Sequence, residues 1–247
     1  MRKYGWKPEL PDHRDYPYTL TAGIVLPPAI DLRSQCPPVY DQGELGSCTA
    51  NALAGAIEFA QLKQKRKTPF IPSRLFIYYN ERTIEGTIGQ DAGAQIRDGI
   101  KTTVKYGACP ETEWAYDATK FAIKPPKKAY TDALNYQVVK YQRLNNISDY
   151  KNCLASGIPF TFGFSVYESF ESEEVAKSGN APMPTKKEKM LGGHAVLCVG
   201  YDDAKQVFIC RNSWGANWGQ KGYFTLPYAY FTPSLTDDFW AIYNVEV

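Results

Sequence analysis

The stretch Tyr40–Ala60, YDQGELGSCTANALAGAIEFA, joins a glycine-rich turn to a helical pattern. Small and apolar residues recur at steps of three and four from Ala50 to Ala60, which predicts a helix of about four turns. Cys48 falls in the first turn of this helix, where free N–H groups and the positive end of the helix dipole favour a thiolate. Free cysteine is also among the residue types most often buried in a core. The choice between nucleophile and packing residue therefore depends on the partners that the rest of the chain offers.

The chain contains two histidines that could act as a base beside this thiol. His13 lies in a proline-rich segment, where no rigid element would position it. His194 follows two glycines in LGGHAVLCVGYDD and precedes an apolar strand pattern. A lone histidine at a strand start is more often structural than catalytic, but a cysteine nucleophile needs a base within reach. His194 is therefore the candidate base for Cys48.

The segment ICRNSWGANWGQKGY contains a group that can orient this histidine. The turn YDDAKQ separates it from the His194 strand, so a hairpin would bring Asn212 close to His194. An amide oxygen can accept the imidazole N–H and fix the ring. Trp214 and Trp218 could shield that hydrogen bond from water, although ordinary core filling would also explain them.

Gln42 lies shortly before Cys48 in the same glycine-rich turn. A surface glutamine usually has no special role. At this place its side-chain amide could point at the same oxyanion as the backbone N–H of Cys48, which makes the pair a candidate oxyanion hole.

The composition describes a soluble globular protein of 247 residues, enough for one large domain or two small ones that share an interface. Hydrophobic residues make up 44% and charged residues 22%, and the net charge of +2 gives no reason to expect a nucleic-acid function. No apolar run approaches the ~20 residues of a membrane helix, so no membrane association is expected.

Six cysteines without short paired spacings predict neither a disulfide scaffold nor a zinc site, and no metal or organic cofactor is implied. The N-terminal residues lack the apolar core of a signal peptide. A cytoplasmic location is therefore the default expectation, with secretion left open if a leader has been removed.

Helical patterns precede strand patterns along the chain. Residues 72–86 and 92–108 are predicted as helices, whereas short β-rich runs dominate the second half, interrupted by a long polar loop at 172–193. This order, without βαβ alternation, predicts an α+β fold in two lobes. Residues 1–25 are rich in proline and charge and are predicted to form an extended arm laid on the main body, 26–247.

These residues together resemble the papain family of cysteine peptidases. The motifs that carry the resemblance are Gly-Ser-Cys ending at Cys48, Gly-His-Ala-Val around His194, and the Asn-Ser-Trp-Gly, Asn-Trp-Gly and Gly-Tyr series from Asn212 to Tyr223. His194 follows Cys48 at the interval of ~130–150 residues typical of that family. The resemblance extends from about Leu26 to the C-terminus.

The resemblance implies a papain-like fold with a helical left lobe, roughly residues 37–136. It implies a β-barrel-like right lobe, roughly residues 137–235 with 26–36, and a cleft between the two lobes. The cleft would hold a Cys48–His194 thiolate–imidazolium pair.

The family also implies roles for the residues around this pair. Asn212 would orient the histidine, and Gln42 would complete the oxyanion hole. The residues implied in substrate binding are Gly46, Gly93, Gly163, Gly193, Ala195, Trp214 and Trp218. Small residues over a floor from the Phe239–Trp240 region suggest a hydrophobic side chain two residues before the cut.

Two positions depart from the family pattern. Leu45 stands where the family usually has a cysteine, and the partner of that cysteine, expected near Gln90, is missing too. Such a joint loss suggests that packing replaces a bridge, as expected for a reducing origin or for a bacterial branch of the family. Thr49 stands where the family usually has tryptophan, so a contact beside the nucleophile must differ.

The implied activity is that of a cysteine endopeptidase acting on peptides or proteins through a thioacyl-enzyme. Proteinaceous inhibitors are implied as partners, and a monomer is expected. Two alternatives stay open: a transglutaminase-like acyltransferase, and an inactive peptide-binding pseudo-peptidase. Twenty-five residues are too few for the family's long helical pro-segment, so the arm 1–25 is expected to stay attached and pack across or beside the cleft.

Overall fold

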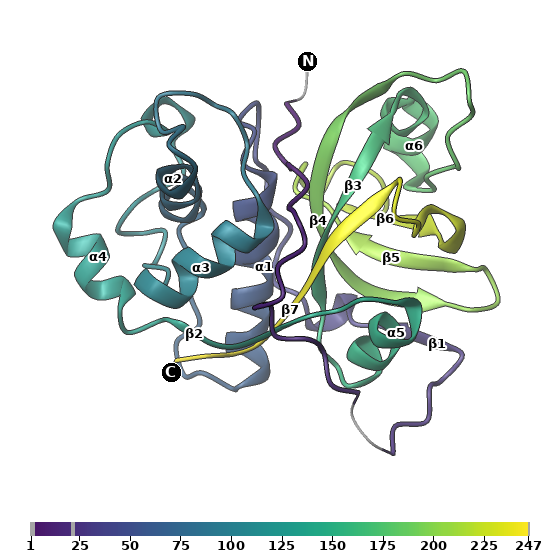
Figure 1. The fold of residues 1–247 in the computed structure, drawn as a ribbon, viewed down its shortest axis with the longest axis horizontal. Coiled ribbons are helices and arrows are strands. Elements are labelled where there is room, and N and C mark those ends of the chain that lie inside the picture. Colours follow the sequence, from purple (N-terminus) through teal and green to yellow (C-terminus); the bar gives the residue numbers. More distant parts are fainter. Residues whose placement is uncertain (1–2, 21–22, 247) are drawn as a thin grey trace.

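A computed structural model describes residues 3–20 and 23–246 of the chain. A helical lobe and a lobe built on a sheet lie side by side, with helix α1 between them (Figure 1). The helices are α1 (Cys48–Lys63), α2 (Arg74–Glu85), α3 (Ile96–Tyr106), α4 (Lys127–Ala133), α5 (Ile147–Ala155) and α6 (Glu173–Ser178). This arrangement confirms the predicted two-lobe α+β fold.

Helix α1 is buried along almost its whole length because it packs on both lobes. Helices α2 and α3 contact one side of it, and strands β4 and β7 contact the other. Its alanines and Gly55 keep the helix narrow, and a Cβ at Gly55 would lie 2.5 Å from Nη1 of Arg211. Cys48, its first residue, is therefore placed where the two lobes meet.

Helices α2 and α3 are bounded by residue types that commonly begin and end helices. The hydroxyl of Ser73 accepts a hydrogen bond from the N–H of Phe76 at 3.1 Å and so caps α2. Gly86 follows α2 with a φ of 70°, and Gly107 follows α3 with a φ of 74°. Both values lie where glycine is favoured, so both helices end where the sequence predicted.

The second lobe is built on an antiparallel sheet. Its strands are β1 (Ala29–Asp31), β2 (Val138–Arg143), β3 (Phe160–Tyr167), β4 (Met190–Asp202), β5 (Val207–Arg211), β6 (Tyr223–Pro227) and β7 (Thr236–Val245). The order is β2-β7-β3-β4-β5-β6, and β1 pairs with β4. The β4–β5 pairing is the hairpin predicted from the turn YDDAKQ.

The sheet is not closed, which corrects the barrel-like description of this lobe. Strands β2 and β6 stand at opposite ends of the order. The backbone of β6 instead meets the chain after α6, through a bridge between Thr225 and Asn180. The edge of the sheet is thus covered by a connecting segment and not by another strand.

The predicted polar loop at 172–193 contains a short helix that its composition concealed. The hydroxyl of Ser172 accepts a hydrogen bond from the N–H of Val175, and Gly179 ends α6 with a φ of 68°. Val175 is the only buried residue of the helix. One buried apolar side chain in six residues is too few to produce a helical period in the sequence.

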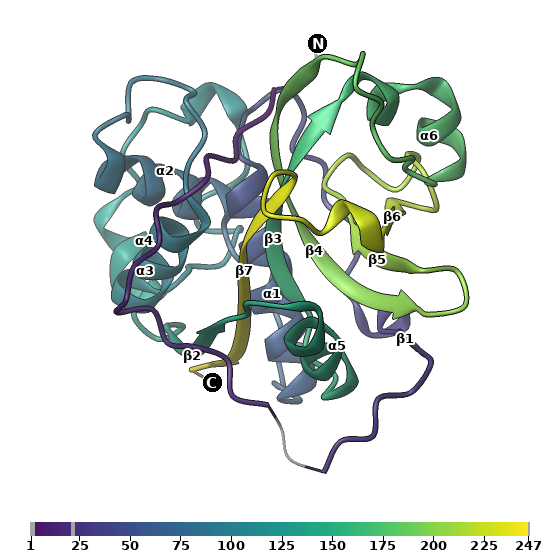
Figure 2. The same cartoon turned by 45° about the vertical axis from the view of Figure 1, so that its right-hand side comes forward.

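Residues 3–20 run as an extended arm over the rest of the molecule. The arm passes between the two lobes (Figure 1) and then along β2 (Figure 2). Isolated bridges join Trp6 to Ala94 and Pro17 to Arg143. The predicted arm also included residues 1–2 and 21–22, which lie outside the described residues. None of the helices described here is long and apolar enough to cross a membrane.

Candidate active site

Cys48 lies beside the strand that carries His194. The backbone of Ala195, the next residue along β4, is within hydrogen-bonding reach of the Cys48 sulfur, and so is the backbone of Gly5 from the arm. Both Cys48 and His194 have no exposed surface in this structure. Cys48 thus lies at the junction of α1 and β4, beside the residue that follows His194.

The imidazole of His194 is held in place by the hairpin partner of its strand. Its Nε2 lies 2.8 Å from Oδ1 of Asn212, and the N–H of Ser213 donates to the same oxygen at 2.8 Å. The ring of Trp214 stacks on the imidazole with centroids 4.9 Å apart, and Trp218 meets Trp214 edge-on at 5.0 Å. Asn212 is 1% exposed, so the predicted shielding by tryptophans is present.

Gln42 is tied to the same segment. Its Oε1 accepts from the Ser213 hydroxyl at 2.6 Å, and its backbone N–H donates to the carbonyl of Ser213 at 2.9 Å. One hydrogen of Nε2 is used on the carbonyl of Leu45 at 2.9 Å, and the amide group has a second one. The glycine-rich turn before Cys48 is thereby fixed to the segment that orients His194.

The Cys48 thiol is not in the thiolate form that the helix end alone would favour. Burial raises the pKa of Cys48 to about 11, which outweighs the hydrogen bonds from Ala195 and Gly5 that lower it. Part of this burial comes from the arm, because Gly5 lies against the sulfur. Burial therefore favours the neutral thiol over the thiolate in this structure.

Consecutive arm residues occupy positions along the site. The ring of Tyr4 lies 6.1 Å from that of His194 and 6.4 Å from that of Trp214, between centroids. Gly5 follows at Cys48, and Trp6 comes next, with its N–H donating to the carbonyl of Gly193 at 2.9 Å. The arm therefore crosses the site from the histidine side to the opposite side.

The glycines predicted to contact substrate lie against the arm instead. A Cβ at Gly163 would overlap the indole of Trp6, and one at Gly193 would lie 2.5 Å from the carbonyl oxygen of Trp6. A Cβ at Gly93 would overlap the backbone of Gly5, whose own Cβ would overlap the carbonyl of Gly46. The missing side chains at Gly93, Gly163 and Gly193, and at Gly5 in the arm itself, permit the extended arm to lie close to the backbone.

Two of the residues predicted to bind substrate make no recorded hydrogen bond or ring contact with the arm among the described residues. Backbone hydrogen bonds to the arm are made by Ala94, next to Gly93: its N–H donates to the carbonyl of Gly5 at 2.7 Å, and its carbonyl accepts from the N–H of Lys7 at 3.1 Å. Trp218 contacts Trp214 but has no contact with the arm among those recorded for the described residues. Trp218 therefore contributes to the site indirectly, by packing against Trp214.

The missing bridge is replaced by packing and by a carboxylate. Leu45 is buried at 5% exposure. Close to the place expected for the absent second cysteine, Asp91 accepts hydrogen bonds from the N–H of Gly46 at 3.0 Å and from the hydroxyl of Tyr78 at 2.7 Å. Asp91 thus joins the loop of Gly46 to the helical lobe without a covalent link.

Thr49 is explained by a buried carboxyl group behind the nucleophile. Its hydroxyl donates to Oε2 of Glu81 at 2.9 Å. Glu81 has no exposed surface, and burial raises its pKa to about 8. The sequence held no signal for this pair, since Glu81 lies on a separate helix.

Glu81 should make the stability of the protein depend on pH. An unfolded glutamate has a pKa of about 4.3. Because the folded value is higher, this stabilising contribution is fully present below pH ~4.3 and is lost as pH rises towards about 8, at about 1.4 kcal/mol per pKa unit. Between pH 5 and pH 8, the free energy of unfolding measured with urea should fall less in Glu81→Gln than in the unaltered chain. Glu174→Gln, at the solvent-facing α6, should keep the original dependence; an equal pH dependence in Glu81→Gln would contradict this assignment.

The sequence analysis did not identify Asp238, which lies under the indole of Trp6. Its Oδ2 accepts from the Trp6 Nε1–H at 2.8 Å, and Asp238 has no exposed surface. From the sequence, the floor of the substrate side-chain pocket was expected in the Phe239–Trp240 region. Phe239 packs in the aromatic core, with its ring 5.5 Å from that of Phe162, while the Trp240 Nε1–H donates to Glu9 at 2.8 Å. An acidic pair in an apolar strand was the available signal.

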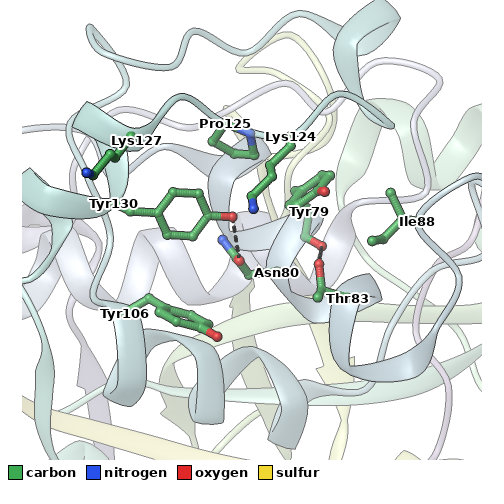
Figure 3. A pocket seen from close by; sticks show the side chains of 9 residues that line it. All are labelled: Tyr79, Asn80, Thr83, Ile88, Tyr106, Lys124, Pro125, Lys127 and Tyr130. Carbon is green, nitrogen blue, oxygen red and sulfur yellow. Dashed lines mark hydrogen bonds between the residues drawn. The ribbon is translucent and has the colours of Figure 1, made fainter.

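A separate cavity of about 780 Å³ lies in the helical lobe, among α2, α3 and α4 (Figure 3). Three tyrosines and two lysines are among its lining residues, and the hydroxyl of Tyr130 donates to Oδ1 of Asn80 at 3.0 Å. No candidate catalytic residue lines it. The candidate site is therefore the arm-covered junction of the lobes.

Comparison with known proteins agrees with this geometry. The family model described as papain family cysteine protease matches residues 26–231. An uncharacterized peptidase C1-like protein of Acanthamoeba polyphaga mimivirus is 45% identical, over 99% of this chain and 88% of that protein. Pro-cathepsin H of Bos taurus is 28% identical over 81% of this chain, which spans 59% of the bovine protein.

A solved structure extends the similarity to the fold. Xylellain, a cysteine protease from Xylella fastidiosa, has 48% sequence identity and a TM-score of 0.92, covering 98% of this chain and 97% of that one. The expected bacterial branch is supported in part, since one of these similar proteins is bacterial and another viral. The chain belongs to the papain family of cysteine peptidases.

Proposed function

We propose that the protein is a cysteine endopeptidase in which Cys48 is the nucleophile and His194 the acid and base. The observation that carries this proposal is the fixed imidazole: Asn212 holds Nε2 at 2.8 Å, and Ala195, next to the histidine, lies at the Cys48 sulfur. A nucleophile, a base and an orienting group are thus contiguous. The substrates would be peptides or proteins, as for the family.

The reaction follows from the roles of these groups. His194 takes the thiol proton of Cys48, and the sulfur attacks the carbonyl carbon of the substrate. The N–H of Cys48 and an Nε2 hydrogen of Gln42 stabilise the oxyanion. The imidazolium gives its proton to the leaving amine, which leaves a thioacyl-enzyme. His194 then takes a proton from water, the resulting hydroxide equivalent attacks the thioester, and the acid product leaves as the thiol is restored.

The course of the arm supports cleavage inside a chain. Tyr4 lies on the histidine side of Cys48, whereas Trp6 and Lys7 lie on the other side. Lys7 reaches Glu85 at 2.8 Å, well into the helical lobe. An extended chain therefore has room on both sides of the sulfur, as an endopeptidase requires.

No specific observation favours the two alternatives. The third group beside the histidine is the amide of Asn212, whereas transglutaminase-like enzymes normally use a carboxylate. A pseudo-peptidase would be expected to lack part of the set, but Cys48, His194, Asn212 and Gln42 are all present and contiguous.

We further propose that the arm keeps the enzyme latent. Gly5 of the arm lies against the Cys48 sulfur, which has no exposed surface. The arm is anchored beyond the site, where Glu9 and Asp15 pair with Arg97 and Arg143 at 2.6 to 3.5 Å. Substrate would have to displace this segment before it could reach the sulfur.

Mass spectrometry of cleaved peptides tests the proposed function. Full-length protein carrying Trp6→Ala, which weakens the arm, is incubated with a library of end-blocked peptides in the presence of a free amine. New internal termini with a free carboxylate are expected. Products joined to the amine would instead indicate acyl transfer, and intact peptides together with an unreactive Cys48 would indicate a pseudo-peptidase.

Replacing the orienting group should lower turnover without unfolding the protein. Asn212→Ala is expected to reduce kcat about 10- to 100-fold, the equivalent of a lost buried hydrogen bond to a charged group at ~1.5–3 kcal/mol. Steady-state kinetics in the Trp6→Ala background would measure this loss. Asn135→Ala, an exposed change in the helical lobe, should leave kcat unaltered; an unaltered kcat in Asn212→Ala would remove Asn212 from the mechanism.

A further inference from the structure

Two buried cysteines face each other across the β4–β5 hairpin. Cys198 of β4 and Cys210 of β5 are direct partners in the antiparallel register. Neither has any exposed surface, and the two thiols lie within hydrogen-bonding reach of each other. Free cysteines are common in protein cores, so burial alone would need no explanation. Contact between two thiols at one register position is a more specific arrangement.

The spacing of the two strands suits a covalent bond between these sulfurs. Residues directly opposite each other in an antiparallel pair have Cα atoms ~4.5 or ~5.5 Å apart, according to the type of pair. Both separations fall within the range of about 4.4–6.8 Å that disulfides span. Because the side chains of opposite residues lie on the same face of the sheet, the bond would require little movement of either strand.

Other neighbours of Cys198 are less suited to its sulfur. The thiol donates to the carbonyl of Gly200 at 3.6 Å, which is a weak bond. Cys153 of α5 also lies near Cys198, but its thiol donates to the carbonyl of Ile158 at 3.4 Å. A helix packed on a sheet holds its Cα atoms farther away than a paired strand, which lies ~4.7–4.9 Å away. Cys210 is therefore the better partner.

A metal ion does not account for the paired thiols. Structural zinc sites take four protein ligands. Within residues 3–20 and 23–246, no group of three or more histidine, cysteine or acidic side chains is arranged to hold a metal ion. The contact between Cys198 and Cys210 therefore points to chemistry between the sulfurs themselves.

The folded core protects both sulfurs, which decides when they can react. Burial raises the pKa of Cys210 well above its ordinary value, so little of it is thiolate, the form that attacks a disulfide. Strands β4 and β5 are joined by the short turn 203–206, so the hairpin can form from local sequence before the lobe closes over it. Oxidation is therefore expected while the lobe folds.

We propose that Cys198 and Cys210 form a disulfide bond when the chain folds in the presence of a small-molecule disulfide such as oxidised glutathione. The thiolate of one cysteine attacks the small disulfide and releases one thiol, which leaves a mixed disulfide. The thiolate of the other cysteine attacks the sulfur of the first and releases the second thiol. Two protons and two electrons thus pass from the cysteines to the oxidant, which is reduced to two thiols.

The bond would link the two strands that hold the candidate site. Asn212 lies just beyond Cys210, and His194 lies on the same strand as Cys198, with its Nε2 2.8 Å from Oδ1 of Asn212. A disulfide stabilises a fold mainly by restricting the unfolded chain. The reduced protein makes the same contacts without the bond, so oxidation adds stability to a fold that both states share.

Refolding in a glutathione buffer tests the proposal. The full-length chain is reduced, unfolded, refolded with oxidised and reduced glutathione, and quenched with acid. Remaining thiols are blocked under denaturing conditions, and the protein is digested without reduction for mass spectrometry. We expect the Cys198–Cys210 link in most molecules, and in fewer molecules when the same oxidation is carried out in denaturant. The oxidised protein should unfold about 5 °C or more above protein refolded without oxidant.

Cys153→Ala is the matched control, because it removes another fully buried thiol near Cys198. It should keep the link and the rise in unfolding temperature, whereas Cys210→Ala should lose both. Refolded unaltered chain with blocked thiols at both Cys198 and Cys210, a link from Cys198 to Cys153, or equal yields of the link with and without folding would each overturn the proposal. These measurements need no peptidase activity, so their failure would leave the proposed function intact.

Discussion

Full-length protein carrying Trp6→Ala is expected to hydrolyse peptides about 10²-fold faster than the unaltered chain. Truncating a buried tryptophan costs ~3–5 kcal/mol, and each 1.4 kcal/mol shifts the balance between seated and displaced arm about tenfold. The change also leaves Asp238 without its donor from the indole. Initial rates on a common fluorogenic peptide, with thermal unfolding recorded in parallel, would measure the effect.

Leu10→Ala is the matched control for this prediction. Leu10 belongs to the same arm but its side chain is exposed, so its truncation should change neither the rate nor the arm's position. A Trp6→Ala protein that is folded and no faster than the unaltered chain would show that the arm does not control access to Cys48.

Removal of the nucleophile should have the largest effect of all. Cys48→Ala in the Trp6→Ala background is expected to lower kcat on the order of 10⁴-fold or more, because covalent catalysis is lost entirely. His194→Ala should cause a loss of similar size, since residues that act as a unit do not contribute independently. Steady-state rates with a continuous peptide assay would detect both losses.

Cys36→Ala tests whether the effect is specific to one thiol. Cys36 is the half-buried cysteine of the chain, and its sulfur donates to the carbonyl of Leu32 at 3.4 Å, away from the site. Its replacement should leave kcat within about twofold. Retained hydrolysis in Cys48→Ala, or a comparable loss in Cys36→Ala, would contradict the assignment of Cys48.

The sequence predicted those contacts of the candidate site that form between elements adjacent along the chain. His194 and Asn212 lie on the two strands of one hairpin, and a short turn between strand patterns is enough to bring them together. Cys48 begins a long helix whose period is plain in the sequence. These relations depend on local patterns, which a single sequence displays.

The contacts that escaped prediction join distant parts of the chain. Trp6 and Asp238 are 232 residues apart, and no local pattern links an indole in a proline-rich arm to a carboxylate in an apolar strand. The pairing of Thr49 with Glu81 likewise depends on how α1 packs on α2. The raised pKa of Cys48 depends on the complete burial of its thiol, which the helix position alone could not reveal.

Alkylation of Cys48 by an epoxide selective for papain-like thiolates tests the central claim most directly. The claim is that one thiol, activated by His194, lies beneath the arm. The site and rate of labelling would be read by peptide mass spectrometry in the unaltered chain, in Trp6→Ala, and in Trp6→Ala with His194→Ala. We predict labelling at Cys48 alone, slow in the unaltered chain, faster in Trp6→Ala and nearly absent without His194. Labelling spread over Cys36, Cys109 and Cys153, or labelling of Cys48 that neither change affects, would contradict the account.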